Sequence, residues 1–341
     1  MTIRIAVDAM GTDSHPEPEL QAVASAIERW PDPITLVGPE TLLEQKLAEL
    51  GISEQRVRVL HAKQVLEMTD KPADSARGKP ESSMAVGMEL IKSGDADAFV
   101  TCGNTGGALA NAIFRLGRIR GVKRPGLTAA FPVRGGQAIV LDIGANTDCK
   151  PEYLLQFAIL GAVYAEKVLG IGSPKVGLLS NGEESGKGNE LIKQAFPLLE
   201  NSGLNFIGNV ESKEVYGGEA DVIVTDGFVG NVFLKTSEAV AAFLIEIIRD
   251  QIQSSPISSI GGLLAKPAFR RVGDILDPEL YGAATLLGVN GLVFIGHGRF
   301  ESNGVFNAIR VARQAAEIHL LDALQEAITS RLSSVPTELA E

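Results

Sequence analysis

Short runs of apolar and β-branched residues alternate along the chain with longer stretches in which apolar residues recur at helical spacing. The short runs predict strands at residues 3–7, 34–37, 57–60, 98–101, 127–131, 138–142, 176–179, 206–208, 222–225 and 292–295. Helical spacing covers residues 106–116, 151–169, 188–201, 231–253 and 305–332, and earlier helices separate the first three strands. This alternation predicts an α/β fold with a mostly parallel open sheet and helices on both faces.

The length of 341 residues allows one large domain or about two ordinary ones. We expect a single large α/β domain over residues 1–333, followed by a frayed tail at 334–341. One stretch differs in composition: residues 251–273 contain no acidic residue but hold apolar side chains beside Lys266, Arg270 and Arg271. Together with the helix before it, this stretch predicts a protruding helical hairpin at 231–275.

The chain is acidic, with 31 Lys and Arg against 42 Asp and Glu and a formal net charge of −11. This balance opposes general binding to nucleic acid. The charge-free apolar run at 239–245 is far shorter than the about 20 residues of a spanning helix. No secretory signal is recognisable, and Cys102 and Cys149 have no metal-ligand spacing. We therefore expect a cytoplasmic protein in a reducing compartment.

Four of the predicted strands end in turns rich in glycine and polar residues, and each turn then enters a helix. These turns are Cys102-Gly-Asn-Thr-Gly-Gly, Ile143-Gly-Ala-Asn-Thr-Asp-Cys-Lys, Ser180-Asn-Gly-Glu-Glu-Ser-Gly-Lys-Gly and Asp226-Gly-Phe-Val-Gly-Asn. In an open parallel sheet such turns share the carboxyl edge, where helix N-termini point unpaired N–H groups at a ligand. The pattern predicts a site for an anionic ligand at that edge.

Several other kinds of site are disfavoured. The turn at 182–188 resembles a nucleotide P-loop, but it is one residue short and Gly188 stands where that loop needs a hydroxyl. No dinucleotide fingerprint follows the first strand, and no nucleophile elbow of a serine hydrolase occurs. A divalent site would require the fold to bring Asp142, Asp148 and Asp226 together, since the histidines have no metal-ligand spacing. We expect neither a metal nor an organic cofactor.

Longer motifs occur in one order along residues 3–315. They are Val7-Asp-Ala-Met-Gly, the turn that begins at Cys102, Leu141-Asp-Ile-Gly-Ala-Asn-Thr-Asp-Cys-Lys, Leu179-Ser-Asn-Gly-Glu-Glu, Gly186-Lys-Gly-Asn-Glu, Phe206-Ile-Gly-Asn-Val-Glu, the turn that begins at Asp226, Tyr281-Gly-Ala-Ala and Gly296-His-Gly. In these motifs the chain resembles the bacterial phosphate acyltransferases of phospholipid synthesis, the PlsX family. Two positions depart from the family pattern: Thr12 replaces a second glycine and Cys102 replaces alanine.

The resemblance implies transfer of a long-chain acyl group from acyl carrier protein to inorganic phosphate. The resulting acyl phosphate would serve a membrane glycerol-3-phosphate acyltransferase. The resemblance also implies a homodimer and a fold related to phosphate acetyltransferases and isocitrate dehydrogenases. Two alternatives stay open: a short-chain phosphate acyltransferase that uses acetyl-CoA, and a noncatalytic protein that binds acyl phosphate or a lipid surface.

Acyl transfer to phosphate requires a site that holds the dianion beside the thioester and stabilises the oxyanion formed on its carbonyl. Lys187 is the candidate for binding phosphate or the oxyanion, unless it pairs with Glu183 or Glu184. Asn231 is the candidate second donor, unless it only caps a helix. The residues expected to bind phosphate or to orient these donors are Gly103, Asn104, Thr105, Gly106, Asn181, Asp226 and Gly227.

Two further residues concern the leaving thiolate and the nucleophile. His297 lies between two glycines and is the candidate acid for the thiolate, unless it is only a turn residue. Cys102 offers a rival mechanism through an acyl-cysteine intermediate, because a thiolate at a strand end before a helix can be stabilised. We expect direct attack by phosphate, which is already a nucleophile at neutral pH.

Two local groups of cations interrupt the acidic composition. The first, called the basic patch below, comprises Arg115, Arg118, Arg120, Lys123 and Arg124. We expect it to dock the acidic acyl carrier protein, unless it is a solvated helix end. The second lies in the predicted hairpin, where the expected contacts with an anionic membrane surface are Ile260, Leu263, Leu264, Lys266 and Phe269. If the hairpin contacts the membrane, the protein associates peripherally with the inner face of the cell membrane. The alternative is that the hairpin forms a dimer contact or packs in the core.

Overall fold

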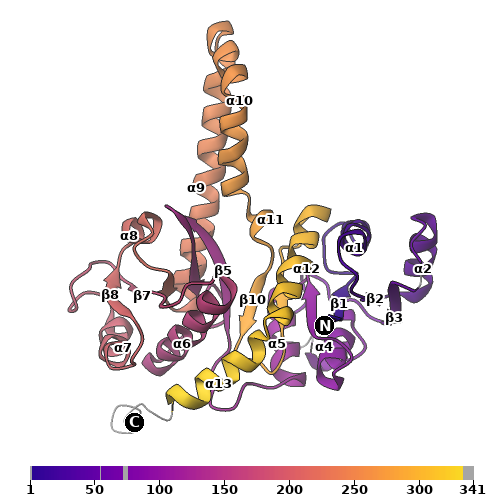
Figure 1. The fold of residues 1–341 in the computed structure, drawn as a ribbon, viewed down its shortest axis with the longest axis horizontal. Coiled ribbons are helices and arrows are strands. Elements are labelled where there is room, and N and C mark those ends of the chain that lie inside the picture. The colour runs from indigo at the N-terminus through magenta and orange to yellow at the C-terminus, as the bar shows by residue number, and fades with distance from the viewer. Residues whose placement is uncertain (1, 54, 72–75, 333–341) are drawn as a thin grey trace.

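A computed structural model describes residues 2–53, 55–71 and 76–332 (Figure 1). Its centre is an 11-stranded sheet in the order β3-β2-β1-β4-β11-β10-β5-β6-β9-β7-β8. The strands are β1 Ile5–Asp8, β2 Ile34–Gly38, β3 Val57–His61, β4 Ala98–Thr101, β5 Gly126–Val133, β6 Gly136–Leu141, β7 Val176–Leu179, β8 Phe206–Val210, β9 Val222–Val224, β10 Ala284–Leu287 and β11 Val293–Ile295. The predicted α/β class is confirmed, and β10 is the strand that the sequence pattern missed.

The strand directions divide the sheet into two parallel halves that run in opposite senses. One half comprises β3, β2, β1, β4 and β11, and the other comprises β6, β9, β7 and β8. Three antiparallel pairings separate the halves: β11 with β10, β10 with β5, and β5 with β6. Because an odd number of reversals lies between them, the carboxyl ends of β4 and β9 lie at opposite edges of the sheet.

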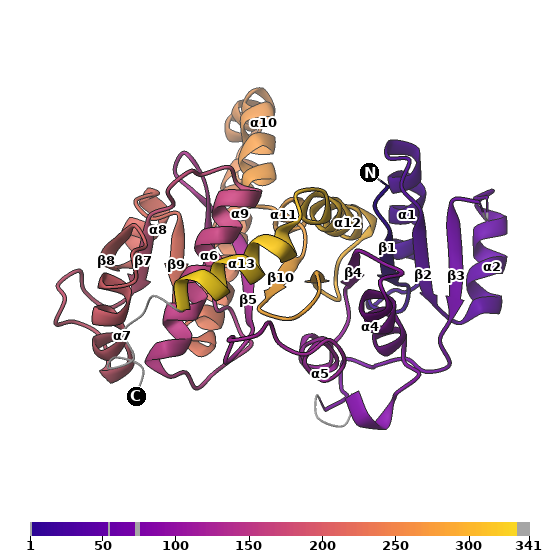
Figure 2. The ribbon, with the colours of Figure 1, turned by 60° about the horizontal axis from the view of Figure 1, so that its bottom comes forward.

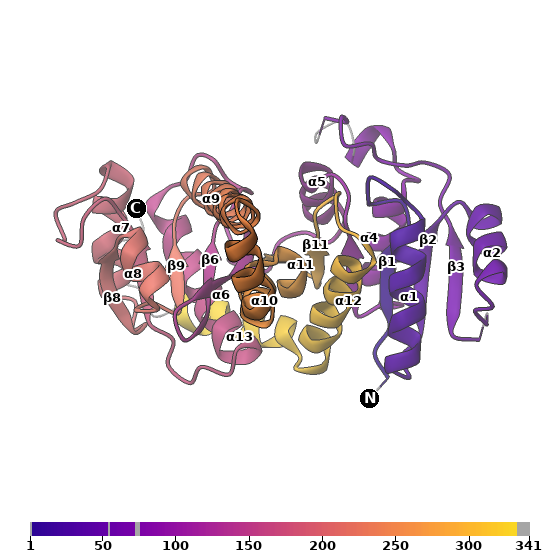
Figure 3. The same cartoon turned by 90° about the horizontal axis from the view of Figure 1, so that it is seen from above.

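Helices cover both faces of the sheet. They are α1 Glu17–Arg29, α2 Glu40–Glu49, α4 Ser83–Ser93, α5 Thr105–Arg115, α6 Pro151–Val168, α7 Glu190–Glu200, α8 Ser212–Gly217, α9 Gly227–Gln253, α10 Pro256–Leu276, α11 Pro278–Tyr281, α12 Ser302–Glu317 and α13 Leu320–Leu332. One face carries α1, α2, α6, α7, α12 and α13 around a core that includes Leu20 and Phe157. The other carries α4, α5, α8 and the first turns of α9 around Met88 and Phe99. Packed pairs are visible in two views, α6 with α13 in Figure 2 and α1 with α12 in Figure 3.

The helix predicted over 305–332 is two helices. His319, with a φ of 52°, separates α12 from α13. The sequence pattern concealed this break because Ala316, Leu320, Leu324 and Ile328 are all buried and keep a four-residue spacing across it. The pattern also missed α4.

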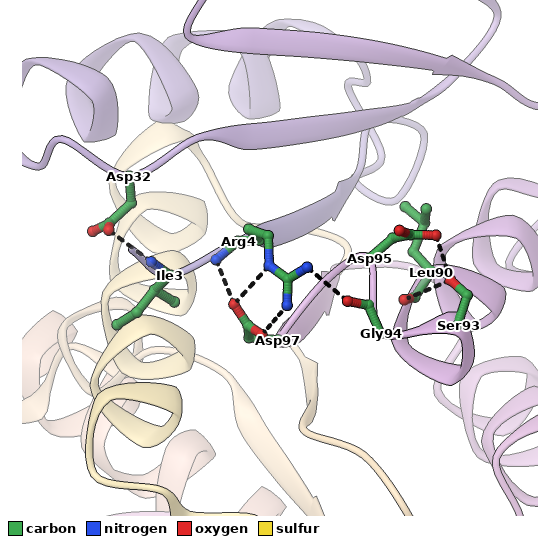
Figure 4. A network of polar contacts seen from close by, with 8 residues as sticks. All are labelled: Ile3, Arg4, Asp32, Leu90, Ser93, Gly94, Asp95 and Asp97. Carbon is green, nitrogen blue, oxygen red and sulfur yellow. Dashed lines mark hydrogen bonds and ion pairs between the residues drawn. The ribbon is translucent and has the colours of Figure 1, made fainter. Parts of the chain in front are cut away.

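Polar contacts join the amino ends of β1 and β4, far from the turns at their carboxyl ends (Figure 4). The Arg4 guanidinium lies 2.6 Å from Asp97 Oδ1 and also donates to the Gly94 carbonyl at 2.6 Å. The backbone N–H of Ile3 donates to Asp32 Oδ1 at 2.9 Å. These contacts hold β1 and β4 in register at the edge opposite the turn after β4.

The hairpin formed by α9 and α10 projects from the body of the protein (Figure 1). It spans 227–276 and is slightly longer than the predicted 231–275. Ser255 begins the second arm, because its hydroxyl oxygen accepts the N–H of Ser258 at 3.1 Å. None of the described residues of α10 is buried. The predicted tail at 334–341 lies outside the described residues.

By length and composition, α9 is long and apolar enough to cross a membrane, a property that the charge-free run at 239–245 did not reveal. Its first turns nevertheless pack on the protein body, where the ring of Phe233 stacks on that of Phe131 with their centroids 5.4 Å apart. The ring of Tyr216 lies 5.7 Å from that of Phe233. Leu234 packs against the same core. We therefore describe α9 as the first arm of an exposed hairpin.

Candidate active site

Asp142 organises the turn that joins β6 to α6. Its side chain is fully buried, and Oδ1 accepts the N–H groups of Leu127 at 3.0 Å, Gly144 at 3.1 Å and Ala145 at 3.0 Å. Oδ2 accepts the N–H of Asn146 at 2.7 Å. Burial raises the pKa of Asp142, and these donors oppose the rise. The carboxylate therefore serves the turn and is unavailable to a ligand.

The turn after β6 also holds the start of α9. The N–H of Gly227 donates to the Asn146 carbonyl at 2.7 Å. Asp226 caps the helix, because its Oδ1 accepts the N–H groups of Phe228 at 3.0 Å and Val229 at 2.9 Å. These bonds explain why α9 begins at Gly227, four residues before its predicted start.

Asn231 is exposed in the second turn of α9 and is not the cap. Its side chain lies over the turn after β6, with Oδ1 3.8 Å from the place where a β-carbon on Gly144 would stand. Gly230 packs directly on the carbonyl of Asp142. The helix start and the turn after β6 thus present the Asn231 amide at the carboxyl edge of β6 and β9.

Lys187 is exposed in the turn between β7 and α7. The stem of its side chain packs over Gly182, where a β-carbon would lie 2.7 Å from Lys187 Cγ. Its backbone N–H donates to the Glu184 carbonyl at 2.9 Å. Glu183 pairs with Lys213 at 2.9 Å, so this carboxylate is engaged by another lysine. Because β7 neighbours β9 in the sheet, Lys187 and Asn231 stand on turns at the same edge.

Buried polar atoms without a hydrogen-bond partner gather at this edge. Four such side-chain atoms occur in the part of the chain that the structure describes, and three of them are Ser180 Oγ, Asn209 Oδ1 and Thr225 Oγ1. Ser180 follows β7, Thr225 follows β9, and Asn209 lies near the end of β8. Buried polar atoms in proteins normally have partners, so a polar ligand at this edge would satisfy them.

Asn181 shapes the turn that carries Lys187, because its Oδ1 accepts the N–H of Gly188 at 2.9 Å. The amide of Asn209, on β8, also holds this turn, because it donates to the Glu184 carbonyl at 2.9 Å. The sequence analysis singled out Asn181 but missed Ser180, Asn209 and Thr225. Their common signal is a hydroxyl or amide residue at the carboxyl end of a strand.

The turn after β4 belongs to the opposite edge, so the expectation that all four turns share one edge is wrong for this turn. Asn104 caps α5, with Oδ1 accepting the N–H of Gly107 at 2.8 Å. Its amide donates to the carbonyls of Met68 and Asp70, both at 3.0 Å. The Asn104 side chain therefore fastens the segment at 67–70. Gly103, Asn104, Thr105 and Gly106 thus follow a strand that runs opposite to β7 and β9, although His297, at the same edge as this turn, contacts Glu238 on α9.

Cys102 is buried, with 1% of its surface exposed. Its Sγ lies 2.6 Å from the place where a β-carbon on Gly296 would stand, so the thiol packs against the backbone of Gly296. Burial raises the pKa of the Cys102 thiol well above its usual value, and the charges of Glu19 and Asp8 add to the rise. A nucleophilic thiolate is disfavoured here, which supports direct attack by phosphate.

His297 is half-buried after β11, and its Nε2 lies 3.5 Å from Glu238 Oε1 on α9. Lys235 and Arg299 also pair with Glu238, at 2.9 Å and 3.7 Å. The hydrogen bond with His297, with further help from Lys235, lowers the pKa of Glu238 to about 2. Glu238 is seven residues after Asn231, a rise of about 10 Å. The structure therefore ties His297 to α9, two turns beyond Asn231.

The basic patch keeps four of its five cations exposed, namely Arg118, Arg120, Lys123 and Arg124. The fifth, Arg115, is engaged within the protein: its guanidinium lies 2.8 Å from Glu89 and donates to the Pro80 carbonyl at 3.1 Å. The expectation that Arg115 is free to dock a partner is therefore wrong. Beside the patch, Phe114 exposes 62% of its surface.

The expected membrane contacts are exposed on the hairpin. Leu263 and Leu264 expose 69% and 79% of their surface, and Ile260 exposes 63%. Phe269 is also exposed, as is the cation Lys266. These residues all belong to α10, the second arm of the projecting hairpin (Figure 1).

Three carboxylates cluster beside the Lys187 turn, and their nearest oxygen atoms lie within 4.8 Å of one another. They belong to Glu183, Glu211 and Glu214. The ammonium of Lys213 lies 2.9 Å, 3.4 Å and 3.2 Å from these residues and offsets part of their negative charge. Hydrogen bonds to the three carboxylates raise the pKa of Lys213. A lysine thus stands where a divalent cation would bind.

The fold is that of solved phosphotransacetylases. The EutD phosphotransacetylase from Staphylococcus aureus superposes with a TM-score of 0.61, covering 92% of this chain and 94% of that chain at 16% sequence identity. At this identity the likeness shows the fold alone. The fold and the polar edge at β7 and β9 therefore define an α/β protein with a phosphotransacetylase-like architecture.

Sequence comparison narrows this class. The model of the fatty acid synthesis protein family matches residues 3–322. The phosphate acyltransferase of Elusimicrobium minutum is 43% identical over 327 residues, which cover 96% of each chain. That of Pelotomaculum thermopropionicum is 45% identical over 330 residues, again 96% of each chain. The chain belongs to the phosphate acyltransferase family and is an acyltransferase, as its motifs predicted.

Proposed function

We propose that the protein transfers a long-chain acyl group from acyl carrier protein to inorganic phosphate, giving acyl phosphate for phosphatidic acid synthesis. The observation that supports this most directly is the carboxyl edge of β7 and β9. Lys187 and Asn231 follow β7 and β9 along the chain, as do Ser180 and Thr225, whose buried hydroxyls have no hydrogen-bond partner. A cation and several neutral donors suit a phosphate dianion that must remain nucleophilic.

The reaction follows from these groups. A phosphate oxygen forms a bond to the thioester carbon, and the carbonyl π electrons move to oxygen. Lys187 holds the phosphate, and the Asn231 amide donates to the oxyanion. The oxyanion then collapses, the C–S bond breaks, and the departing thiolate takes a proton from solvent. His297, the candidate donor from the sequence, lies at Glu238, two helical turns beyond Asn231. The products are acyl phosphate and the free thiol of the carrier.

We place phosphate at the edge of β7 and β9 rather than at the turn at 103–106. Asp226 and Gly227 fix the start of α9, and Asn181 fixes the Lys187 turn, so all three act by orienting donors. In the other turn, the Asn104 amide already bonds backbone carbonyls. This assignment leaves Gly103, Thr105 and Gly106 with a supporting role in the other half of the sheet.

The exposed part of the basic patch is the proposed docking surface for acyl carrier protein. Four cations without a local acid give an acidic partner a region of attraction on an acidic enzyme. Phe114, exposed beside them, adds an aromatic side chain of the kind that anchors protein interfaces. Arg115 is paired with Glu89 within the protein and is therefore not part of the proposed contact surface.

The apolar hairpin supports a cytoplasmic enzyme bound peripherally to the inner face of the membrane. Exposed leucines beside Lys266 combine apolar burial with attraction to anionic lipid. This location suits an insoluble product whose consumer is a membrane glycerol-3-phosphate acyltransferase.

A homodimer is also proposed. Leu244 and Ile248 remain exposed on α9, and a second copy would cover them.

One assay tests the proposed function. The purified protein is incubated with hexadecanoyl acyl carrier protein or with acetyl-CoA, each with and without phosphate, while released thiol is measured. Phosphate-dependent release from the long-chain carrier is expected. Release from acetyl-CoA alone would make the protein a short-chain enzyme, and no release from either would favour a noncatalytic binding protein.

A further inference from the structure

The segment that joins β8 to α8 holds the turn that carries Lys187. The Asn209 amide donates to the Glu184 carbonyl at 2.9 Å, and the same carbonyl accepts the backbone N–H of Lys187 at 2.9 Å. Asn209 is 5% exposed, and its Oδ1 has no hydrogen-bond partner among the described residues. This buried side chain therefore spends its hydrogen bond on the carbonyl that also binds Lys187.

An irregularity in β8 brings Asn209 to this turn. The register of β8 against β7 shifts by one residue just before Gly177, which lies opposite Gly208. Gly208 has a φ of 98°, a conformation that favours glycine and occurs in β-bulges. Because of the shift, Asn209 lies opposite Leu178, on the face of the sheet that α7 covers. Without it, Asn209 would lie opposite Leu179, on the other face.

Lys213, in the first turn of α8, contacts the same turn through a carboxylate. Its ammonium lies 2.9 Å from Glu183 Oε1, and Glu183 comes four residues before Lys187. The other two partners of Lys213 are Glu211 and Glu214, which form the capping box of α8 and are fixed by that helix start. No carboxylate in the described part of the chain forms an ion pair with Lys187. Lys213 thus binds a carboxylate that could otherwise pair with Lys187.

We propose that Asn209 and Lys213 are positioning residues for Lys187. Asn209 fixes the backbone of the turn, and Lys213 keeps the Glu183 carboxylate from competing with phosphate for the Lys187 ammonium. This gives a role to the motif Phe206-Ile-Gly-Asn-Val-Glu, which the proposed reaction does not otherwise use. The inference rests on the proposed function, because it takes Lys187 as the residue that holds phosphate.

Asn209→Asp tests the backbone contact through its pH profile. A protonated carboxyl group can donate to the Glu184 carbonyl as the amide does, whereas a carboxylate cannot. Burial raises the pKa of a carboxyl group, so the introduced group should lose its proton between about pH 5 and 8. We expect kcat/KM for phosphate, relative to the unmodified protein at the same pH, to be near normal at about pH 5. It should fall by about a hundredfold at about pH 8, the cost of misplacing Lys187 by about 1 Å.

Two further variants make this readout specific. Asn209→Leu removes the donor, so its kcat/KM for phosphate should be about a hundredfold low at every pH. Asn205→Asp is the matched control, because Asn205 is exposed just before β8 and its amide donates to the Ser173 carbonyl at 3.0 Å. Its pH profile should equal that of the unmodified protein.

The Michaelis constants separate a positioning role from a loss of folded protein. In the two Asn209 variants the KM for phosphate should rise, while the KM for the acyl carrier substrate should not change. Partial unfolding would instead lower kcat and leave both KM values as they are. Thermal unfolding at each pH checks that the variants are folded at the assay temperature.

Lys213→Met tests the charge contact. It releases Glu183, so the KM for phosphate should rise about threefold to fivefold at low salt and less at high salt, because exposed ion pairs are weak and screened. Adding Glu183→Gln to Lys213→Met should restore the KM, since Glu183 then carries no charge. Lys193→Met, at an exposed lysine of α7, is the matched control and should leave the KM for phosphate unchanged.

An Asn209→Asp activity ratio that did not change with pH would overturn the role of Asn209. If that variant did not fold, an unchanged KM for phosphate in Asn209→Leu would overturn it equally. For Lys213, the contrary results are an unchanged KM in Lys213→Met, or a raised KM that Glu183→Gln does not restore. In each case the unmodified protein still releases thiol with phosphate. Absence of that release in the unmodified protein would contradict the proposed function instead, so the two failures are distinguishable.

Discussion

Gly230 lies so close to Asp142 that a β-carbon on Gly230 would stand 1.9 Å from the Asp142 carbonyl oxygen. This contact fixes the start of α9 on the turn after β6. Asn231 is the next residue along the helix. The close approach of the Gly230 and Asp142 backbones therefore determines where the Asn231 amide lies.

Gly230→Ala should therefore displace the start of α9. Overpacking of this kind costs about 1–3 kcal/mol in the free energy of unfolding. A displacement of Asn231 by about 1 Å should lower kcat by about a hundredfold. Thermal unfolding and thiol-release assays check both effects, with Gly172→Ala as the control because no atom lies within 4 Å of a β-carbon there. A Gly230→Ala variant with normal stability and turnover would contradict this role.

Lys187→Ala and Asn231→Ala should each lower kcat by about 10²–10³-fold, the usual cost of removing one donor to a developing oxyanion. Both side chains are exposed, so the stability of the fold should change little. Lys193→Ala is the control, because Lys193 is an exposed lysine on α7, six residues further along. Near-normal turnover in either variant would remove that residue from the proposed mechanism.

The pH dependence of stability should report on Glu19, which is 1% exposed. Burial raises its pKa from 4.5 to about 7, although Thr12 donates two hydrogen bonds to it. Between these values the folded protein holds the proton more tightly than the unfolded chain. The contribution of Glu19 to stability is therefore fully present below pH 4.5 and is lost as pH rises through 7.

Glu19→Gln replaces the carboxyl group with an amide that does not titrate. Relative to the variant, the free energy of unfolding of the unmodified protein should fall by about 3 kcal/mol as pH rises through this window. Denaturant unfolding at several pH values measures the difference, and Glu28→Gln, exposed on the same helix, is the control. Parallel stability curves for Glu19→Gln and the unmodified protein would show that Glu19 ionises normally.

Arg118→Glu combined with Arg120→Glu should raise the apparent KM for the acyl carrier substrate by about tenfold at low salt, and less at high salt, since surface charges are screened. The rate at saturation should stay nearly constant. Arg58→Glu with Lys193→Glu makes the same change in charge at exposed positions elsewhere and serves as the control. If both double variants bind the carrier equally well, docking does not use the basic patch.

Leu263→Glu combined with Leu264→Glu should lower binding to anionic phospholipid vesicles by at least about tenfold, because each leucine buried in lipid contributes about 1.5–3 kcal/mol. Sedimentation with vesicles measures the bound fraction, and light scattering checks that the oligomeric state is unchanged. Leu42→Glu with Leu50→Glu, at an exposed leucine of α2 and at the exposed leucine that follows its last residue, is the control. Undiminished sedimentation of the hairpin variant would eliminate the membrane proposal.

Local chemistry accounts for what the sequence predicted well. Ten strands were recognisable because each is a short apolar run bounded by turn residues, as in the run that becomes β7. The polar residues of the turns after β7 and β9 were also predictable, since Asn181, Lys187 and Asn231 follow predicted strands and stand beside glycines. The exposed residues of the hairpin were likewise visible as a stretch without acids.

The failures have a different physical origin. Asn104 and Asn231 follow similar turns in the sequence, yet the structure uses Asn104 to bond Met68 and Asp70 and leaves Asn231 exposed. Arg115 belongs to a run of cations, but a glutamate 26 residues earlier in the chain engages it. Such partners are distant in sequence, so no local pattern reveals them.

The sequence by itself determined the alternation of strands and helices, the family and the residue types at each strand end. These follow from side-chain periodicity and turn chemistry, which act over a few residues. Only the tertiary structure decided which turns meet. Strand direction depends on backbone pairing between distant segments, and the three antiparallel pairings around β10 and β5 place the turn after β4 at one edge of the sheet and those after β6, β7 and β9 at the other.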